Sequence, residues 1–316
     1  MTATAGAGLL IAAQCVVLLA WSPLLVGVMR QVRARMEGRA GAGVAQPWRD
    51  LAKLAEKEPL QADGVRLAGL LPIVMMGISL LLVALLPLLG TLTLPLVPDD
   101  LFVVVSVLLL GTVTIALVGL DSGTAFGGMG SSRHMTIAAL VEPTVLVAVY
   151  ALSIPVGTSA LSAIVAARVE APATVVSPVS LLSLVALTIV VIAETGRLPV
   201  DNPATHLELT MVHEAMILES SGRDLMWLEY ASWLRLAALL GLVVNLAAPW
   251  GIASALTPAA LLLALVALVV KLTAAGALLA AVEVFLAKLR LFRVPELLAG
   301  SFVLAFLAVT ASYLVA

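Results

Sequence analysis

Seven of the nineteen acidic residues of this chain lie in one segment, Ala193–Tyr230, directly after an apolar run. The segment opens with AETGRLPVDNPATHLELTMVHEAM, which holds four carboxylates, two histidines and one arginine. Carboxyl groups within hydrogen-bond or one-water reach of one another can pass protons, and burial and like charge raise their pKa values. We therefore predict that the segment contributes to an ion-coupling path, through Glu194, Arg197, Asp201, Glu208, Glu214 and Glu219.

A solvated protein surface is the plainer explanation of these acids. That explanation accounts for charge along one side of a helix. It does not account for Glu194 and Arg197 at the boundary of the apolar run. It also leaves unexplained why seven acids are accompanied by only two basic residues, Arg197 and Arg223.

The two histidines of the segment, His206 and His213, sit near glutamates in a pattern that can bind a metal. They are seven residues apart and would share one face of a helix. A zinc-protease HExxH motif would need histidine at position 217, where the chain has Ile217. The spacing therefore predicts no metal site, and an intramembrane metalloprotease is excluded for the same reason.

Further ionisable residues lie inside or at the end of apolar runs. Glu142 and Lys271 are each deep in such a run, and a lone charge at membrane depth is costly. Each must therefore be protonated, paired or exposed to a wet cavity. Glu283 is twelve residues beyond Lys271, about 18 Å along a helix, so these two cannot pair directly. We add four residues to the predicted ion-coupling set: Asp121, Glu142, Lys271 and Glu283.

The elements that must position these residues are transmembrane helices. Of the 316 residues, 62% are hydrophobic and 11% are charged, whereas a soluble domain is roughly half apolar and a quarter charged. Alternating apolar and polar strands are absent from the sequence, which argues against an outer-membrane barrel. The pattern predicts an all-α, polytopic integral membrane protein that forms a single transmembrane domain over residues 1–316. Its eight predicted spans are Leu9–Met29, Leu67–Leu94, Leu101–Leu120, Met135–Val156, Pro178–Ala193, Leu225–Ala248, Pro258–Ala281 and Pro295–Val315. The second span contains Pro72 and Pro87, so we expect it to be kinked or tilted.

Lysine and arginine set the expected orientation, because cytoplasmic loops are enriched in them. They concentrate in the loops at about 30–66, 121–134, 194–224 and 283–294, whereas the alternate loops carry only Arg168. Both termini are therefore expected outside. In the first loop, Pro47–Glu58 has one apolar and one charged face, which predicts an amphipathic helix on lipid headgroups or against a peripheral subunit. The predicted partner-docking residues are Arg35, Arg39, Lys53, Lys57, Arg133, His206 and His213.

Cysteine usage limits the chemistry that this chain can perform alone. Cys15 is its only cysteine, and one thiol cannot hold an iron–sulfur cluster or form an internal disulfide. No phosphate-binding glycine-rich loop is present. Any redox cofactor is therefore expected in a partner, and no nucleic-acid partner is expected.

Four stretches of the sequence resemble the respiratory complex I subunit 1 family. They are AETGRLPVDNPATHLELTMVHEAMILE (Ala193–Glu219), GLDSGTAFGGMGSSR (Gly119–Arg133), KLRLFRVPE (Lys288–Glu296) and DLAKLAEKE (Asp50–Glu58). The first is most similar to the hydrogenase branch, which includes the membrane subunits of formate hydrogenlyase, hydrogenase-4 and other group 4 energy-converting hydrogenases. The quinone-reducing branch instead has Glu-Thr-Asn-Arg followed by Pro-Phe-Asp at this place.

The resemblance implies a non-catalytic subunit of an oxidoreductase complex in a bacterial or archaeal plasma membrane. Such a subunit anchors the hydrogenase large and small subunits, which carry the [NiFe] centre and iron–sulfur clusters. It couples their chemistry to H⁺ or Na⁺ movement through antiporter-like subunits, and it binds no cofactor of its own. The family's carboxylates carry over to Glu142, Glu194, Asp201, Glu208, Glu214 and Glu219, with Arg197 beside them.

Two other functions stay open at this point. The chain could form the quinone pocket of an NADH:quinone oxidoreductase-type complex, although the VDNPATHLE variant makes a quinone an unexpected ligand. It could also be a stand-alone secondary transporter, which the buried charges would suit. No internal repeat that pairs the two halves of the sequence supports a transporter.

Overall fold

Helices make up most of the computed structural model, which describes residues 2–60, 65, 67, 69–92, 99–201 and 211–315. Its 3-10 helices are η1 (Ile154–Val156), η2 (Pro172–Val176) and η3 (Leu291–Arg293). Its α-helices are α1 (Thr2–Met36), α2 (Gln46–Ala55), α3 (Leu71–Leu85), α4 (Leu101–Asp121), α5 (Ala125–Ser153), α6 (Leu161–Glu170), α7 (Pro178–Glu194), α8 (His213–Ile217), α9 (Gly222–Ala247), α10 (Pro258–Phe285) and α11 (Val294–Val315).

Each of the eight predicted spans corresponds to one apolar helix: α1, α3, α4, α5, α7, α9, α10 and α11. Within the described residues, six of these are long and apolar enough to cross a membrane, judged by length and composition. The other two, α3 and α7, are shorter apolar helices. The predicted all-α, polytopic membrane fold is confirmed.

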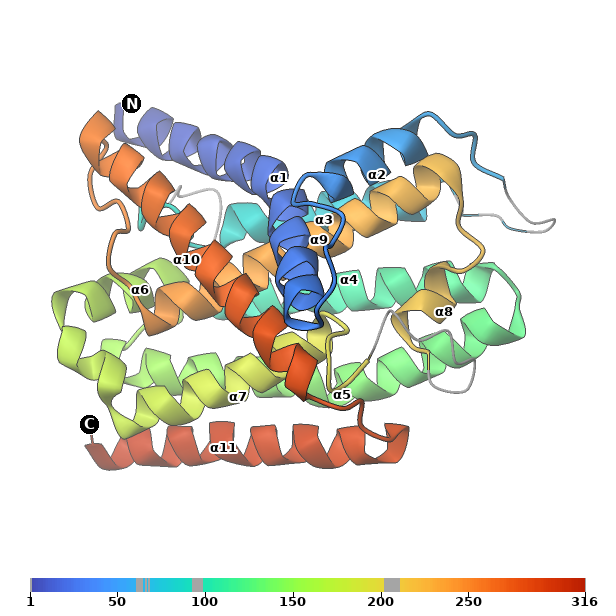
Figure 1. Cartoon of the computed structure of the whole chain (residues 1–316). Coiled ribbons are helices and arrows are strands. Elements are labelled where there is room, and N and C mark those ends of the chain that lie inside the picture. The colour runs from blue at the N-terminus through green and yellow to red at the C-terminus, as the bar shows by residue number, and fades with distance from the viewer. Residues whose placement is uncertain are drawn as a thin grey trace.

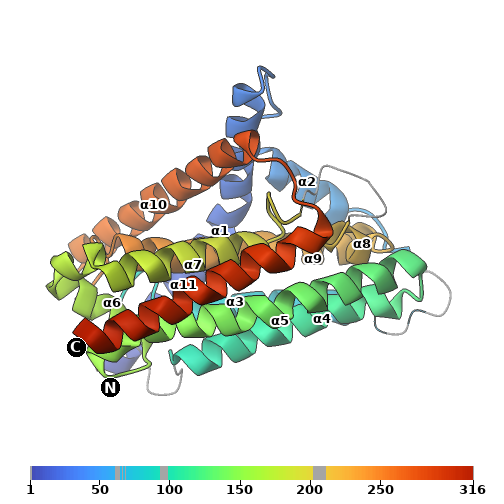
Figure 2. The ribbon, with the colours of Figure 1, turned by 90° about the horizontal axis from the view of Figure 1, so that it is seen from below.

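The apolar helices form one bundle with a continuous hydrophobic core. Helix α5 packs against α4, α7 and α11, and α9 packs against α1, α3, α7 and α10. Helices α1 and α10 cross the others obliquely (Figures 1 and 2). Leu18, Leu82, Leu187 and Leu234 are among the core side chains that solvent does not reach.

The two ends of the bundle differ in the short elements that they carry. Helix α6 and both ends of the chain lie at one end, which we call the α6 end (Figure 1). Helix α8 and the start of α9 lie at the opposite end, the α8 end (Figure 1). The α2 helix is also at the α8 end, where the Arg223 Nε donates to the carbonyl of Ala55 at 3.1 Å.

Helix α2 confirms the amphipathic helix expected in the first loop, with bounds Gln46–Ala55. Pro47 and Leu51 are buried, and Lys53 on the opposite face is exposed. The Trp48 ring meets the Tyr230 ring of α9 edge to face, with centroids 6.0 Å apart. This contact fixes one face of α2 against the bundle.

The second predicted span forms a shorter helix than expected. It is not one kinked helix over residues 67–94. Helix α3 begins at Leu71 with Pro72 in its first turn and ends at Leu85, two residues before Pro87. Proline is tolerated in a first helical turn, where its missing N–H is not needed, but it stops a helix that would continue through it. The chain therefore leaves the helix inside the apolar core, where Leu86, Leu88 and Leu89 are buried.

Two polar side chains supply the hydrogen bonds that this non-helical backbone needs. The Gln14 amide of α1 donates to the carbonyl of Leu86 at 2.8 Å and accepts from the N–H of Leu89 at 3.0 Å. The Asn245 amide of α9 donates to the carbonyls of Pro87 and Leu88, each at 3.0 Å. Without such partners, exposed peptide groups in an apolar medium are strongly disfavoured.

The glycine-rich stretch between the third and fourth spans is also different from its prediction. The prediction of a loop over about 121–134 is wrong, because α5 already begins at Ala125. The Thr124 hydroxyl caps that helix by accepting from the N–H of Gly127 at 3.2 Å. The glycines instead allow close helix packing. A Cβ atom on Gly127 would lie 2.2 Å from the Gly119 carbonyl oxygen of α4.

Replacement of Gly127 by alanine is therefore expected to destabilise the fold. The added methyl would meet backbone rather than a flexible side chain, so α4 and α5 must separate, at a cost of about 1–3 kcal/mol in the free energy of unfolding. Gly128→Ala is the matched control, because nothing lies within 4 Å of its Cβ position and alanine favours a helix. Thermal unfolding in detergent should show a lower midpoint for Gly127→Ala only. Equal midpoints for the two variants would contradict the close contact.

Candidate functional site

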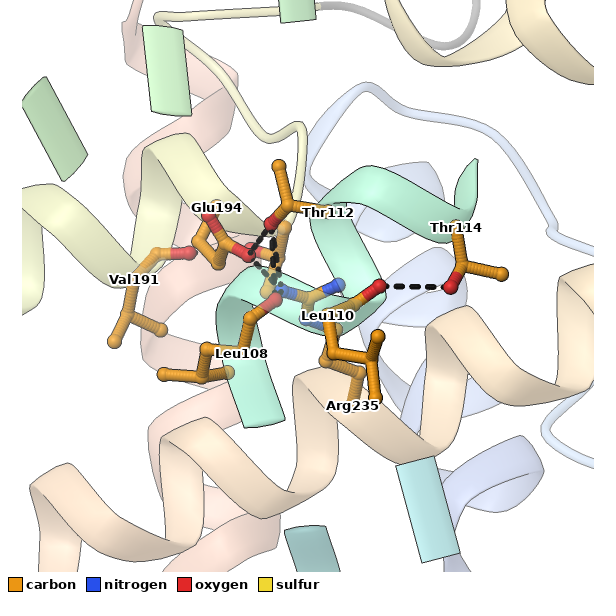
Figure 3. Close-up of polar contacts among 8 residues, drawn as sticks. Leu108, Leu110, Thr112, Thr114, Val191, Glu194 and Arg235 are labelled. Carbon is orange, nitrogen blue, oxygen red and sulfur yellow. Dashed lines mark hydrogen bonds and ion pairs between the residues drawn. The ribbon is translucent and has the colours of Figure 1, made fainter. Parts of the chain in front are cut away.

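The centre of the bundle contains an ion pair between Glu194 and Arg235. Glu194 is the last residue of α7, and Arg235 lies in the middle of α9. Their side chains are 3% and 8% exposed. The same Arg235 nitrogen also donates to the Leu108 carbonyl at 2.9 Å and to the Thr112 hydroxyl at 3.2 Å, both on α4 (Figure 3). One guanidinium therefore joins three helices.

Room for this guanidinium comes from a glycine in α4. A Cβ atom on Gly111 would lie 2.8 Å from the second terminal nitrogen of Arg235. Sequence reasoning placed Arg235 in the sixth span without giving it a role. The available signal was a lone arginine in an apolar helix, which needs a buried counter-charge.

A second carboxylate, Glu142 of α5, lies beside this pair. It interacts with the side chains of Glu194, Thr112 and Arg235. One of its oxygens is buried and accepts no hydrogen bond from the described residues. The local group thus has two carboxylates and one guanidinium, and binding one proton or one monovalent cation would make it neutral.

His134 stands two turns before Glu142 on the same helix, and sequence reasoning missed it. Its Nε2 atom is buried and has no hydrogen-bond partner in the part of the chain that the structure describes. Arg235 and His213 are its charged or titratable neighbours. A neutral imidazole has one donor and one acceptor nitrogen, so His134 is a polar group of the cavity lining. The signal that could have found it is a histidine eight residues before Glu142 on one apolar helix.

Glu194, Arg235 and His134 line a cavity of about 320 Å³, which we call the central cavity. Its inner wall carries Glu194, Arg235 and His134, and its outer part carries Arg30, whose side chain is 53% exposed. The Arg30 guanidinium lies over the ring of Trp233, 5.5 Å from its centroid. The other polar lining side chains are Arg33, Thr195, Arg197, His213, Glu214, Glu229 and Ser232.

Arginines and acids both occur in and beside the lining of this cavity. Arg33 of α1 forms an ion pair with Glu283 in the last turn of α10, whose side chain is fully buried. Burial lowers the pKa of the Arg197 guanidinium from its ordinary value, and the nearby Glu283 carboxylate opposes that shift. The cavity therefore joins the α8 end of the bundle to the buried carboxylates through a polar lining.

This chain has clear relatives among known proteins. A model of the NADH dehydrogenase family, the family of complex I subunit 1, matches residues 9–314. The chain belongs to this family. As a member of the complex I subunit 1 family, it is a complex I-like, multi-pass membrane subunit.

Two curated relatives of this family member come from Escherichia coli (strain K12). Formate hydrogenlyase subunit 4 is 32% identical over 297 residues, which is 93% of this chain and 95% of that protein. Hydrogenase-4 component C is 32% identical over 263 residues, which is 82% of this chain and 81% of that protein. The fold is similar to a chain of the membrane-bound sulfane sulfur reductase, an archaeal respiratory membrane complex. That match has a TM-score of 0.85 and 20% identity, and covers 97% of this chain and 99% of that chain.

The predicted coupling residues that the structure of this family member describes do not form one continuous row. The central cavity brings together Glu194, Arg197 and Glu214, with Glu142 behind its inner wall and Glu283 beside Arg197. Two further predicted residues, the acid Glu208 and the docking residue His206, fall outside the described residues.

Asp201 does not line the cavity and instead connects two segments of the chain. Its carboxylate forms an ion pair with Lys288 at 2.8 Å and accepts from the N–H of His213 at 3.2 Å. The N–H of Leu289 donates to the Pro199 carbonyl at 2.9 Å. Asp201 therefore ties the linker between α10 and α11 to the start of α8.

The remaining predicted coupling residues lie away from the cavity. Asp121 accepts from the N–H of Leu67 at 2.8 Å, nine residues or about 13 Å of helix beyond Thr112. Glu219 is exposed at the α8 end. Lys271 donates to the Asn245 side chain at 3.4 Å, so it belongs with the polar groups around the end of α3.

The predicted docking residues are mostly accessible. Arg35, Arg39, Lys53 and Lys57 are exposed. Arg133 instead donates to the Met211 carbonyl at 3.0 Å, which holds the backbone just before α8. His213 lines the central cavity.

A double-mutant cycle should detect the central ion pair. Arg235→Leu leaves Glu194 buried without its cation and is expected to lower the free energy of unfolding by about 3–5 kcal/mol. Combination with Glu194→Leu should cost less than the sum of the two single variants, because the second change removes the uncompensated charge. The free energy of unfolding of the unmodified chain, the two single variants and the double variant is measured by equilibrium unfolding in a denaturing detergent.

Arg39→Leu serves as the surface control for this cycle. Arg39 pairs with Glu37, but its side chain is 69% exposed, and such pairs contribute only about 0–1 kcal/mol. Additive effects of the Arg235 and Glu194 variants would show that the two charges are not coupled.

Proposed function

We propose that this chain is the membrane-anchor and ion-coupling subunit of a complex I-like energy-converting hydrogenase of the formate hydrogenlyase type. The observation that carries the proposal is the buried pair of Glu194 and Arg235 at the inner wall of the central cavity, with the partly buried Glu142 interacting with both from behind that wall. Together, the two carboxylates and one guanidinium need one more positive charge for neutrality. Relatives named as hydrogenase components support the choice of complex.

The coupling step uses this charge deficit. A proton or Na⁺ ion enters from the α8 end through the lining of the cavity and reaches Glu194. It then moves to Glu142. His134 adds a neutral polar group to the cavity lining beside Arg235 and His213. Two carboxylates that compete for one guanidinium cannot both be ionised at low cost in an apolar interior, so occupancy of one affects the other.

Glu142 is the exit of this path in the proposal. Glu142 is only partly buried, and its neighbours Ala139 and Pro143 on α5 are exposed on the side of the bundle. An ion released there passes sideways to an antiporter-like membrane subunit rather than straight through this chain. The same arrangement makes the chain one part of a pathway and not a complete transporter.

Docking of the hydrophilic module is assigned to the α8 end. Lys53 and Lys57 are exposed on and just after α2 at that end, and Arg35 and Arg39 are exposed at and just after the end of α1. These cations are suited to acidic patches on the hydrogenase large and small subunits. Those subunits would carry the [NiFe] centre and the iron–sulfur clusters, and this chain would bind no cofactor. The α8 end would face the cytoplasm of a bacterial or archaeal cell, with both termini outside.

Glu142→Gln tests the coupling role in the assembled complex. Hydrogenase turnover and the pH gradient across proteoliposomes are followed together, with and without Na⁺. The variant keeps a hydrogen-bonding side chain but cannot exchange a proton. Ion translocation per turnover should therefore fall on the order of a hundredfold, the lower end of what a positioned proton-transfer group contributes.

Glu170→Gln is the control for this experiment, because Glu170 is an exposed acid of α6 at the opposite end of the bundle. It should translocate ions like the unmodified complex. Normal translocation by the Glu142 variant would reduce the carboxylate group to a structural feature. A bound quinone in the purified complex would instead favour a quinone-reducing function.

The docking surface has a separate test. Lys53→Glu combined with Lys57→Glu reverses two exposed charges and should weaken co-purification of the hydrophilic subunits by about tenfold or more at low salt, since like charges then face each other. Glu56→Lys, a charge reversal of the opposite sign on the same short element, should not weaken it. Unchanged assembly in the lysine double variant would place docking elsewhere.

A further inference from the structure

Arg168 of α6 is a buried cation at the α6 end of the molecule. It is 6% exposed, and one of its terminal nitrogens donates to the Ser180 hydroxyl. Its Nε atom is buried and has no acceptor among the residues that the structure describes. Burial alone lowers the pKa of Arg168 to about 10, so the side chain still carries its charge at neutral pH. A buried charge of this kind is costly unless a counter-charge is supplied.

A cavity of about 340 Å³, the α6 cavity, lies against this arginine. Leu152, Val156 and Val179 form apolar walls. The hydroxyl of Ser312, on α11, also lines the cavity and is buried without a hydrogen-bond partner in the described part of the chain. Two polar groups without full hydrogen bonding thus face one space. The other polar lining residues, Thr174 and Ser177, already donate their hydroxyls to nearby backbone carbonyls, and the rest of the lining is apolar.

The α6 cavity is accessible from the surface. Pro155, Ala171 and Pro178 line it and are exposed, which places its rim on the outside of the bundle. The surface around it is apolar, since Val176 is 72% exposed and Leu181 is 52% exposed. In a membrane, acyl chains would contact this rim.

We propose that the α6 cavity is a binding site for an anionic phospholipid, with Arg168 holding the phosphate. A guanidinium matches phosphate oxygens through paired hydrogen bonds, and it is less strongly hydrated than an ammonium group. The Ser312 hydroxyl provides a further donor, and an acyl chain covers the apolar walls. A free phosphate ion would satisfy the arginine but would leave those walls unfilled. This site is independent of the hydrogenase function proposed above.

Native mass spectrometry of the full-length chain in a mild detergent tests the site. The probes are phosphatidylglycerol, inorganic phosphate and diacylglycerol, which separate the contributions of the phosphate and the acyl chains. The unmodified chain should retain one phosphatidylglycerol molecule and neither of the other two probes. Arg168→Gln should weaken that binding about tenfold, which is the typical effect of losing a hydrogen bond to a charged group. Arg293→Gln, which removes an exposed cation outside the cavity, should bind like the unmodified chain.

A second variant separates loss of the site from loss of the fold. Ala167→Leu adds bulk to a residue that lines the cavity and leaves Arg168 in place. It should also weaken phosphatidylglycerol binding, and it should remove the rise in unfolding temperature that the lipid gives the unmodified chain. Unchanged lipid binding in both variants would overturn the proposal. So would equal binding of inorganic phosphate or diacylglycerol, or the finding that an acidic side chain of another subunit occupies the cavity in the assembled complex.

Discussion

The cost of placing charge in an apolar interior governs how this bundle is arranged. A buried charge needs an opposite charge and hydrogen-bond partners close to it. For the Arg235 guanidinium these are Glu194 and two oxygens of α4, whereas its Nε has no partner among the described residues. That requirement brings the end of α7, the middle of α9 and the carbonyl of Leu108 on α4 to one point. The small residue Gly111 is needed at the same point, because a side chain there would displace the guanidinium.

The same constraint explains the polar side chains elsewhere in the core. Helix α3 ends inside the bundle, and its free backbone groups are matched by the Gln14 and Asn245 amides. Arg33 and Glu283 meet at the side of the central cavity. These partnered groups each hold two or more helices together. Among the described residues, buried polar atoms without a partner gather around that cavity. They belong to His134 and Arg235 in its lining, to Glu142 behind its inner wall and to Glu283 beside it.

The sequence was sufficient to predict the number and order of apolar helices, because long apolar runs have few alternatives to a membrane helix. It also predicted that Glu194 and Arg197 do not belong to an ordinary solvated face. It could not identify Arg235 as the partner of Glu194, since the two are 41 residues apart and only the packing of α7 against α9 brings them together. Arg197 was the nearer candidate along the chain, but it lies with Glu283.

The predictions of helix ends were wrong where distant parts of the chain decide the local structure. The Gly119–Arg133 stretch has a composition typical of loops, yet its glycines serve helix contact at Gly127, which depends on where α4 lies. Pro87 was expected to bend a helix and instead ends one, because Gln14 and Asn245 stabilise the broken backbone. No local pattern reveals that such a partner is available 72 residues away in the chain, which is the separation of Gln14 from Leu86.

Trp233 gives the central cavity a natural optical reporter. One face of its ring is covered by the Arg30 guanidinium at the outer part of the cavity. Indole emission responds to nearby charge and to water, so its wavelength depends on whether Arg30 stays over the ring. A partner that draws Arg30 away, or an ion that enters the cavity, would change the emission wavelength of Trp233, which is one of the five tryptophans of the chain.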